Sequence, residues 1–500
     1  MCGLPGALLA CEGADDPPVD LAIETIVIIS IDTLRADYLG CYGNEIVSTP
    51  YIDALAEQSI LFEQHISNSP TTLNSHTSLM TGTYAHTHGV ARNGFEVDDR
   101  NEMLAEILSE AGYFTAGFAG AFPLSDEFNF DQGFDHYDVP DEFRSGDEVN
   151  SSVFSWLDRE RPGDGDPIWE TAVELAPTLS LAFLNGGIWA PAVVATLFGD
   201  FSSVGSLDPT GPLFLFVHYW DVHYPYTPPA PYDRMYRSDD LAISGSMDDL
   251  KVVRQGLHAG VGGAASDAVK GLYAGGVSLV DHHVGVLLAG LAARNRFDSA
   301  IVLLTSDHGE GMDEHWEFWD HGESLYDTTL HTPLIIHLPG DEQGGTRRSQ
   351  LVGNVDVLPT LLDHLNLPIP AVVEGISFNP LLGGGVVAQR PPVFSEATKP
   401  HGRPFGSGDW DNEFKSKSVR EAGWKLVHYP ILDRSELFDL SADPGEQHDL
   451  LESALPAAVE KAAGMRAQLQ AWMDGERIES SDPDLSPEAR ERLRALGYAE

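Results

Sequence analysis

Two apolar segments of this chain each run into side chains that can bind a metal ion. Asp32 directly follows the apolar run 25–31, and Asp307-His308 follows the run 300–305 after one serine. Such runs are typical of buried parallel strands, and open α/β sheets bind ligands at the carboxyl ends of these strands. Two buried carboxylates need a cation to offset their desolvation and repulsion. The pattern predicts a metal site that contains Asp32, Asp307 and His308, with simple capping of the following turns as the alternative.

A candidate nucleophile lies between these two segments. Residues 69–82 have the pattern of a loop that enters a short helix, and Thr72 stands just before the first helical turn. Free backbone N–H groups and the helix dipole favour an anion at this place. A hydroxyl close to a divalent cation can lose its proton and act as a nucleophile. Thr71 and Thr72 could equally be N-caps, but the neighbouring ligand candidates favour a nucleophilic Thr72.

Alternating apolar strands and helical stretches must position these residues. The pattern predicts an α/β fold with a large, mainly parallel sheet sandwiched by helices, followed by a small C-terminal antiparallel α+β subdomain. The expected helices share a helical spacing of apolar residues: Tyr51–Ile60, Met103–Ala111, Leu272–Ala293, Asp356–Leu365 and Ala454–Trp472. The expected C-terminal strands are Val393–Glu396, Lys417–Val419, Trp424–Tyr429 and Glu436–Leu440.

The same pattern divides the chain into four parts. Residues 1–20 form a leader or linker, and residues 21–384 form the catalytic domain, which carries an insertion at 158–210. Residues 385–475 form the C-terminal subdomain, and residues 476–500 form a polar tail with a short, loosely held helix.

Several motifs together resemble the sulfatases of the alkaline phosphatase superfamily. They occur in the family's order over about residues 24–455: DTLRADYLGCYG (32–43), TPYID (49–53), residues 78–90, FLFVHYWDVH (214–223), TSDHGE (305–310), DVLPT (356–360) and LFDL (437–440). Motifs in register are far more specific than one short pattern. The resemblance implies an alkaline phosphatase-like fold with a one-metal site.

This chain departs from the sulfatase pattern at the nucleophile. Thr72 stands where a typical sulfatase has the Cys or Ser that is converted to formylglycine, and Asn74 and His76 replace a Pro and an Arg. Threonine cannot give the same aldehyde, so no formylglycine is expected. Threonine is the nucleophile in phosphoryl-handling branches of the superfamily, such as nucleotide pyrophosphatase/phosphodiesterases and lipoteichoic acid synthases.

The expected function is therefore metal-dependent hydrolysis of phosphate or sulfate esters, with a leaning to phosphomonoesters, phosphodiesters or phosphonate esters. Three alternatives remain open: a true (aryl)sulfatase without formylglycine, a phospho-group transferase and a non-catalytic relative.

The resemblance also assigns roles to individual residues. Asp32, Asp307 and His308 look like metal ligands, and the Thr72 hydroxyl completes the set. The donors suit one divalent ion, which could be Mn²⁺, Zn²⁺, Ca²⁺ or Mg²⁺. Thr33 replaces an Asp of the typical calcium site and His308 replaces an Asn, and both changes favour manganese or zinc.

Three histidines and one asparagine are the remaining site candidates. His223 and His321 match positions that contact the anion or the leaving oxygen, so each is a candidate hydrogen-bond donor or general acid. His76 replaces the arginine that steadies the nucleophile, which a neutral imidazole does less well. Asn93 is a candidate substrate contact.

Fixed positive charge should be scarce in this pocket. The family lysine is absent from residues 120–123, so the metal and the histidines must stabilise the anion. His218 and His315 are interpreted as structural or rim residues, and Asp281 as a hydrogen-bonded core acid.

Composition restricts the partners. The net charge is −48, from 77 acidic and 29 basic residues, which argues against binding to nucleic acid or to an anionic membrane. Apolar stretches in the 158–210 insertion suggest a lid or an apolar substrate wall, and hence a small-molecule or amphiphilic anionic ester. A packed helical hairpin without a binding role is the alternative. Nothing in the sequence predicts an oligomeric state.

The N-terminus indicates a location. The apolar run Leu4–Ala10 ends at Cys11 and resembles the end of a bacterial lipoprotein signal, which predicts a membrane tether through Cys11 in the periplasm or at the cell surface. No Lys or Arg precedes the run, so a spurious match and a cytoplasmic location are the alternative.

Overall fold

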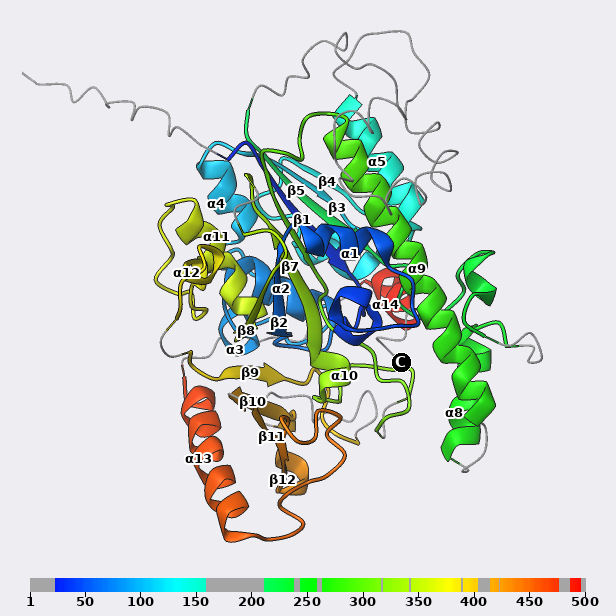
Figure 1. Ribbon diagram of the computed structural model, residues 1–500, viewed down its shortest axis with the longest axis vertical. Coiled ribbons are helices and arrows are strands. Elements are labelled where there is room, and N and C mark those ends of the chain that lie inside the picture. The colour runs from blue at the N-terminus through cyan, green and yellow to red at the C-terminus, as the bar shows by residue number, and fades with distance from the viewer. Residues whose placement is uncertain are drawn as a thin grey trace, which may run out of the picture.

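The computed structural model describes residues 23–158, 211–237, 243–258, 263–315, 318–340, 343–387, 390–402, 414–421, 423–475 and 486–495. The chain forms a large α/β part and a smaller part below it in Figure 1. The predicted lipoprotein signal with Cys11 and nearly all of the predicted insertion lie outside the described residues.

An eight-stranded sheet forms the centre of the large part. The strand order is β4-β3-β5-β1-β6-β7-β2-β8. Neighbouring strands are parallel except around β7, which is antiparallel to both β6 and β2. The strands are β1 (Thr25–Ile31), β2 (Ile60–Ile66), β3 (Phe114–Phe118), β4 (His136–Asp138), β5 (Leu213–Tyr219), β6 (Ala300–Thr305), β7 (His331–His337) and β8 (Thr346–Gly353).

The three central strands end together. Every residue of β5, β1 and β6 is buried, as their continuous apolar sequences predict. Ser30 of β1 pairs in register with His218 of β5 and with Thr305 of β6. The residues that follow β1 and β6 therefore emerge at the same edge of the sheet, where the candidate ligands lie.

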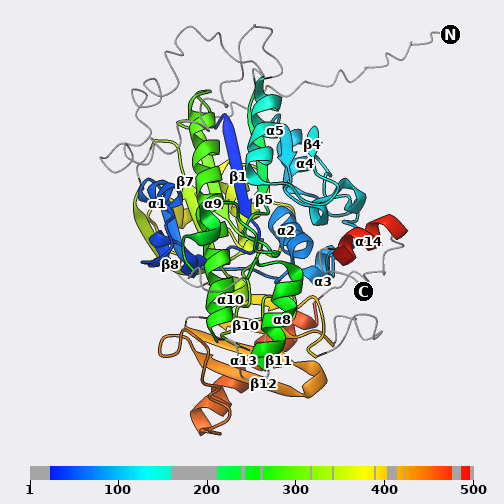
Figure 2. The same cartoon turned by 90° about the vertical axis from the view of Figure 1, so that its right-hand side faces the viewer.

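Helices cover both faces of the sheet (Figure 2). Because successive strand residues point to opposite faces, Ile28 belongs to one hydrophobic cluster and Val27 to the other. The described helices of the large part are α1 (Pro50–Glu57), α2 (Thr72–Thr81), α3 (Ala85–His88), α4 (Leu104–Glu110), α5 (Gly146–Asp158), α8 (Met247–His258), α9 (Gly263–Ala292), α10 (Asp327–Leu330), α11 (Val357–His364) and α12 (Asn379–Leu382). Helices α2, α4 and α11 pack on the first face, and α1, α5 and α9 pack on the second.

The long helix α9 is a core element. It is apolar enough by length and composition to suit a membrane span, but 83% of its most apolar window is buried inside the molecule. Asp281 on α9 accepts hydrogen bonds from the backbone N–H groups of Tyr51 (3.1 Å) and Ile52 (2.8 Å) at the start of α1. The prediction of a hydrogen-bonded core acid is confirmed.

The C-terminal part is an antiparallel sheet with one long helix beside it (Figure 1). Its strands, in the order β12-β11-β10-β9, are β9 (Val393–Glu396), β10 (Lys417–Glu421), β11 (Trp424–Tyr429) and β12 (Arg434–Asp439). Helix α13 (Pro456–Met473) packs Met465 and Leu469 against Val419 and Leu426. The predicted fold class is confirmed.

A buried ionic cluster joins the two parts. Asp327 of α10 accepts from Arg420 Nη1 at 2.6 Å and from Lys425 Nζ at 2.9 Å. Lys425 Nζ also lies 2.7 Å from Glu446 Oε1. Since Lys425 and Glu446 are both almost completely buried, each charge depends on its partners in the cluster.

The C-terminal tail holds one helix against the large part. In α14 (Pro487–Ala495), the side chains of Ala489 and Leu493 are buried in the first hydrophobic cluster. The Arg492 guanidinium lies 5.0 Å from the centre of the Phe122 ring. The expectation of a loosely held tail is wrong for this helix, because its apolar side chains find a place in the core.

Candidate metal and ester site

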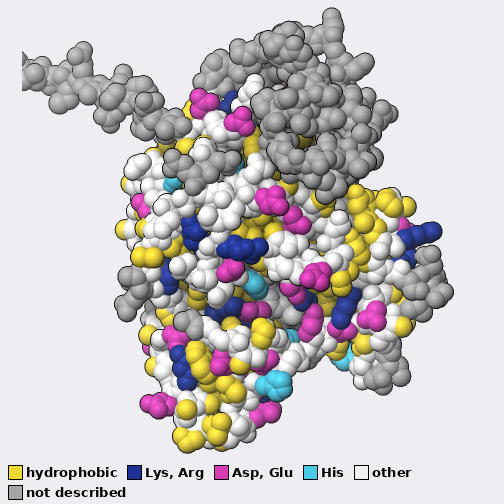
Figure 3. Space-filling model, in the orientation of Figure 1, with side chains coloured by type: hydrophobic (Ala, Val, Ile, Leu, Met, Phe, Trp, Pro, Cys, Tyr) yellow, Lys and Arg dark blue, Asp and Glu magenta, His cyan; other side chains and the backbone are white. Residues whose placement is uncertain are grey.

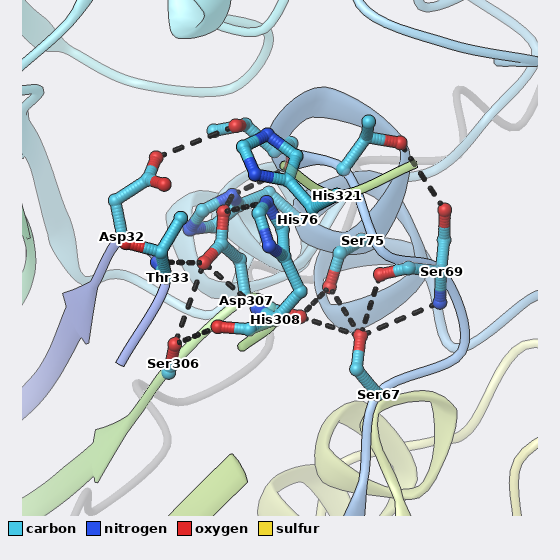
Figure 4. A network of polar contacts seen from close by, with 12 residues as sticks. Asp32, Thr33, Ser67, Ser69, Ser75, His76, Ser306, Asp307, His308 and His321 are labelled. Atoms are coloured by element: carbon cyan, nitrogen blue, oxygen red, sulfur yellow. Dashed lines mark hydrogen bonds and ion pairs between the residues drawn. The ribbon is translucent and has the colours of Figure 1, made fainter. Parts of the chain in front are cut away.

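Asp32, Asp307 and His308 lie together at the carboxyl edge of the sheet (Figure 4). One ligand atom of each falls within 4.8 Å of the others, and all three side chains are buried. Ser75 of α2 donates a hydrogen bond of 2.6 Å to the carbonyl oxygen of Asp307, which ties the helix that carries Thr72 to the end of β6. The structure therefore brings together the three residues that the sequence places about 275 positions apart.

His308 presents a lone pair to this cluster. Its Nδ1–H donates to the carbonyl oxygen of Gly309 at 2.8 Å, so Nε2 is the free acceptor of the neutral ring. Nε2 lies 3.4 Å from Asp307 Oδ2. Burial lowers the pKa of His308 to about 4, which keeps the ring neutral near pH 7. A backbone carbonyl that fixes the tautomer is the usual support of a metal-binding histidine.

Three buried ligand atoms in this cluster have no hydrogen-bond partner among the residues that the structure describes: Asp32 Oδ1, Asp307 Oδ2 and His308 Nε2. Burial raises the pKa of Asp32 well above its usual range, and the nearby charges of Asp307 and Glu310 raise it further. The two carboxylates therefore do not both ionise unless a cation compensates them. Two carboxylate oxygens, an imidazole nitrogen and a nearby hydroxyl fit a divalent metal ion.

Thr33 contributes its backbone to this cluster. Its N–H donates to Asp307 Oδ1 at 3.1 Å, and its carbonyl accepts from the Tyr273 hydroxyl at 2.7 Å. The Thr33 φ angle is +55°, which is rare for a β-branched residue. The backbone N–H of Thr33 therefore orients the Asp307 carboxylate.

Thr72 is the first residue of α2, and its hydroxyl lies beside the cluster. Oγ1 donates to Asp32 Oδ2 at 3.3 Å. Thr71 occupies the N-cap position, as the capping alternative expects, but its side chain makes no capping hydrogen bond, and Thr72 is not the N-cap. The hydroxyl of Thr72 faces a carboxylate rather than the helix backbone.

Asn93 holds the same end of α2. Its Oδ1 accepts from the backbone N–H of Leu73 at 2.8 Å, and its buried Nδ2 has no hydrogen-bond partner. The amide oxygen therefore positions the helix, and the amide nitrogen can donate a hydrogen bond to a ligand.

His76 packs under the first turn of α2. Its Nδ1–H donates to the carbonyl oxygen of Thr72 at 2.8 Å, so Nε2 accepts from the Ser30 hydroxyl at 2.8 Å. Burial lowers its pKa, which agrees with a neutral ring. Nδ1 lies 3.9 Å from Asp307 Oδ2. With both nitrogens engaged, His76 acts here as a support for Thr72 and β1.

His218 also lies at the site, and it is fully buried, so the alternative of a rim position is wrong. Its Nδ1 accepts from the Gly120 N–H at 3.3 Å, and its Nε2–H donates to Asp32 Oδ2 at 3.2 Å. Burial lowers its pKa to about 3. His76, His218 and Asp307 form a second group with metal-ligand spacing. The signal for His218 is the register of β5 against β1, which the sequence does not display.

His321 is held by a buried carboxylate. Its Nδ1–H donates to Glu310 Oε1 at 3.1 Å, and Glu310 Oε2 accepts from the Tyr226 hydroxyl at 2.7 Å. The His321 ring centre lies 4.4 Å from that of His308. Glu310 was not identified as a site residue from the sequence, because it appears there only as the last residue of a motif.

His223 stands next to His321, with ring centres 5.1 Å apart. Its Nδ1–H donates to the carbonyl oxygen of Tyr224 at 2.6 Å, and its ring stacks on Trp220 at 3.6 Å between centres. Burial lowers its pKa well below the usual range. His315, in contrast, stacks on Tyr326 outside this group of histidines.

The C-terminal part closes one side of the site. The Gly322 carbonyl, next to His321, accepts from the backbone N–H groups of Thr398 (2.8 Å) and Lys399 (3.2 Å). Lys399 Nζ lies 3.7 Å from Asp320 Oδ2, and the buried Lys415 Nζ donates to the Ala91 carbonyl at 3.1 Å. These two lysines, which sequence reasoning missed, bring positive charge to the loops that carry His321 and Asn93.

Comparisons with known proteins agree with this geometry. The family model described as Sulfatase matches residues 24–367, and the model described as N-sulphoglucosamine sulphohydrolase, C-terminal, matches residues 314–474. An arylsulfatase of Clostridium perfringens is 26% identical over 461 residues, covering 86% of this chain and 90% of the relative. The multifunctional alkaline phosphatase superfamily protein PehA of Trinickia caryophylli is 24% identical over 494 residues, covering 89% and 94%.

A solved structure shares the fold. The phosphonate monoester hydrolase of Agrobacterium radiobacter superposes with a TM-score of 0.65 at 22% identity, over 91% of this chain and 97% of that one. Fold and site together define a hydrolase of the class that acts on sulfate or phosphate ester bonds. Within this class, the chain belongs to the sulfatase family.

Proposed function

We propose that this protein hydrolyses phosphorus esters that carry a single negative charge, namely phosphodiesters or phosphonate monoesters, with Thr72 as the nucleophile. The observation that carries the proposal is the position of Thr72 Oγ1, 3.3 Å from Asp32 Oδ2 and beside the unpartnered ligand atoms of Asp32, Asp307 and His308. An activated hydroxyl next to buried carboxylates is the arrangement that nucleophilic catalysis requires.

The ligand set would hold one divalent ion through Asp32, Asp307, His308 and Thr72, with manganese or zinc favoured by the imidazole. When bound, such an ion supplies positive charge that favours the ionised hydroxyl and offsets the charge of the anion. Thr72 Oγ attacks phosphorus, and the bond from phosphorus to the leaving oxygen breaks. Water later cleaves the ester that has formed on Thr72.

His321 is the best placed proton donor for the leaving oxygen. Glu310 accepts from its Nδ1–H and stabilises the protonated ring, whereas the His223 Nδ1–H already donates to a backbone carbonyl. Asn93 Nδ2 is available to a non-bridging oxygen of the substrate. His76 positions Thr72 through the carbonyl oxygen of that residue.

Two features favour a phosphorus ester of low charge. The histidines that burial keeps neutral add no fixed positive charge, so a monoanion is easier to compensate than a dianion. An unmodified threonine also lacks the second hydroxyl with which a formylglycine hydrate expels sulfate. Its ester must be opened by water, as phosphoryl-transfer enzymes do.

The test combines a substrate panel with trapping of the intermediate. Aryl esters of phosphate, methylphosphonate, methyl phosphate and sulfate are assayed with Mn²⁺, Zn²⁺, Ca²⁺ and Mg²⁺. Thr72→Ala should abolish turnover, Thr72→Ser should retain part of it, and the matched change Thr77→Val on the same helix should have little effect on chemistry. Acid quenching should leave phosphorus on the peptide that contains Thr72. Full activity of Thr72→Ala, or a preference for sulfate, would contradict the proposal.

A further inference from the structure

A cavity of about 460 Å³ opens beside His223, between α5, the loop after β5 and α9. Its wall is largely apolar and aromatic, with Phe143, Phe154, Trp220, Pro228, Leu279 and Val286 among the lining residues. Its volume lies within the range of small-molecule sites, and a few polar groups in an apolar wall are typical of such sites. Phe143 is 49% exposed, so its ring is accessible from solvent at the edge of this cavity.

The cavity adjoins the ester site through His223. His223 lines it, and the ring of Trp220, which also lines it, stacks on His223 with 3.6 Å between centres. His223 stands 5.1 Å from His321, which in turn stands 4.4 Å from the metal-ligand candidate His308. A leaving group that passes His223 therefore enters this cavity.

The charges around the cavity disfavour a second anionic group. Arg144 is the one fixed cation among the described lining residues, and its guanidinium already donates to Asp138 Oδ2 at 3.0 Å. Asp147 and Asp221 add acidic side chains to the wall, and no group in the described part of the chain donates a hydrogen bond to Asp221 Oδ2. Burial lowers the pKa of His282 to about 4, so this ring is neutral near pH 7.

We propose that this cavity binds the leaving group of the ester and selects an uncharged, largely apolar ring or short chain over an anionic sugar. This proposal rests on the proposed function of the adjoining site, because the cavity would bind the organic part of the same ester. Wall residues recognise the group by contact area, and Asp147 and Asp221 repel carboxylate, sulfate or phosphate substituents. A second cavity of about 430 Å³ is different in character, because Arg254, Lys399 and Arg434 contribute to its lining.

The test uses two esters with the same phosphorus group, one with a 2-naphthyl and one with a 3-carboxyphenyl leaving group. The metal-loaded protein should prefer the naphthyl ester in kcat/KM by at least about tenfold, the scale of discrimination by an apolar pocket. Val286→Arg, on the half-buried outer face of α9, should lower kcat/KM for the naphthyl ester about tenfold and raise it for the carboxyphenyl ester. Val252→Arg, a matched change at a 68% exposed helix position away from the cavity, should change neither.

A second variant and a binding measurement keep the two proposals separable. Phe143→Ala removes an exposed ring, leaves the fold intact and should weaken use of the naphthyl ester several-fold. Calorimetry should detect 2-naphthol binding to the wild type and to Thr72→Ala, and weaker binding to Val286→Arg. If 2-naphthol binds but no ester is hydrolysed, the proposed hydrolase function is contradicted and the assignment of the cavity stands. Hydrolysis with equal use of both esters, or with Val286→Arg identical to Val252→Arg, would overturn the cavity assignment alone.

Discussion

The backbone N–H of Thr33 donates a 3.1 Å hydrogen bond to Oδ1 of Asp307. The N–H of His308 donates to the same oxygen at 2.8 Å. The Ser306 hydroxyl also donates to Oδ1 at 3.4 Å, so Oδ2 is the oxygen that remains for a cation, and it lies 3.4 Å from His308 Nε2. Backbone hydrogen bonds thus orient this carboxylate before any ion binds, as is typical of preorganised metal ligands.

Asp307→Asn should abolish tight metal binding. The amide keeps the size of the side chain but replaces one carboxylate oxygen with a nitrogen that cannot act as a ligand. We expect metal affinity to fall by more than the roughly 10–100-fold that follows loss of an outer-shell partner. Elemental analysis after dialysis measures this directly. Asp98→Asn, at an exposed carboxylate, is the control, and normal metal content in Asp307→Asn would contradict the assignment.

His321→Gln should slow substrates in proportion to the basicity of their leaving groups. If His321 protonates the leaving oxygen, its loss should cost about 10²–10⁴-fold for an alkoxide and little for a nitrophenolate, which needs no proton. A plot of log kcat against leaving-group pKa measures this slope in both proteins. His315→Gln, at a stacked histidine outside the site, should leave the slope unchanged. An equal loss for all leaving groups would point to anion binding instead.

Asn93→Asp should separate the two roles of this residue. The aspartate keeps an oxygen for the Leu73 N–H, so the free energy of unfolding should change little, but it loses the Nδ2 donor and adds a negative charge. We expect a fall in kcat/KM of at least tenfold, on the scale of one lost hydrogen bond to a charged group. Asn101→Ala, at another buried asparagine, should lower stability without this selective loss. Unchanged kinetics in Asn93→Asp would remove it from the substrate site.

Glu446 should make stability depend on pH. Burial and the charge of Asp327 raise the pKa of Glu446 from 4.5 to about 7, although Lys425 opposes the shift. The folded state therefore holds this proton more tightly than the unfolded state. Its contribution is complete below pH 4.5 and is lost as the pH rises through 7. The Tm of the wild type should fall relative to that of Glu446→Gln, which cannot titrate, as the pH rises through this window, and a constant difference would contradict the shift.

Lys425→Met should destabilise the junction between the two sheets. The change leaves Glu446 without its cation and Asp327 with only Arg420, and loss of one partner of a buried ion pair costs about 3–5 kcal/mol. Denaturant unfolding measures the loss. Lys461→Met, which removes a half-exposed ion pair with Glu421, should cost about 1 kcal/mol or less. Similar midpoints for the two variants would show that the cluster does not hold the parts together.

Much of the fold follows from the sequence, because periodic apolar residues are a local signal. The strands Val393–Glu396 and Trp424–Tyr429 have the predicted bounds. Boundaries fail where two elements share an apolar run. The helix expected to reach Ile60 ends at Glu57, since Ile60 already begins β2. Helix α9 begins at Gly263, nine residues before the apolar stretch that was recognised, because its first turns consist mainly of small residues such as Gly and Ala.

The site could be predicted only in part, for a different reason. Asp32, Asp307 and His308 sit at the ends of strands, where a motif marks them. His218 lies inside the motif 214–223, but the motif does not show that it reaches Asp32, because this contact depends on the register of β5 against β1. Lys399 and Lys415 belong to the C-terminal part. Its position beside the site depends on tertiary packing, which local sequence patterns do not show. On the face in Figure 3, acidic side chains are dispersed among other surface residues rather than gathered in one patch.

The contact of Thr398 and Lys399 with the Gly322 carbonyl has a consequence for protein engineering. A Cβ at Gly322 would approach Thr398 Oγ1 to 3.1 Å, and the φ angle there is +99°, so the two loops fit each other with little room to spare. A chimera that grafts a relative's C-terminal module onto this large domain would need to reproduce that fit. Without it, the graft would displace the neighbouring His321 while every residue of the recipient domain stayed the same.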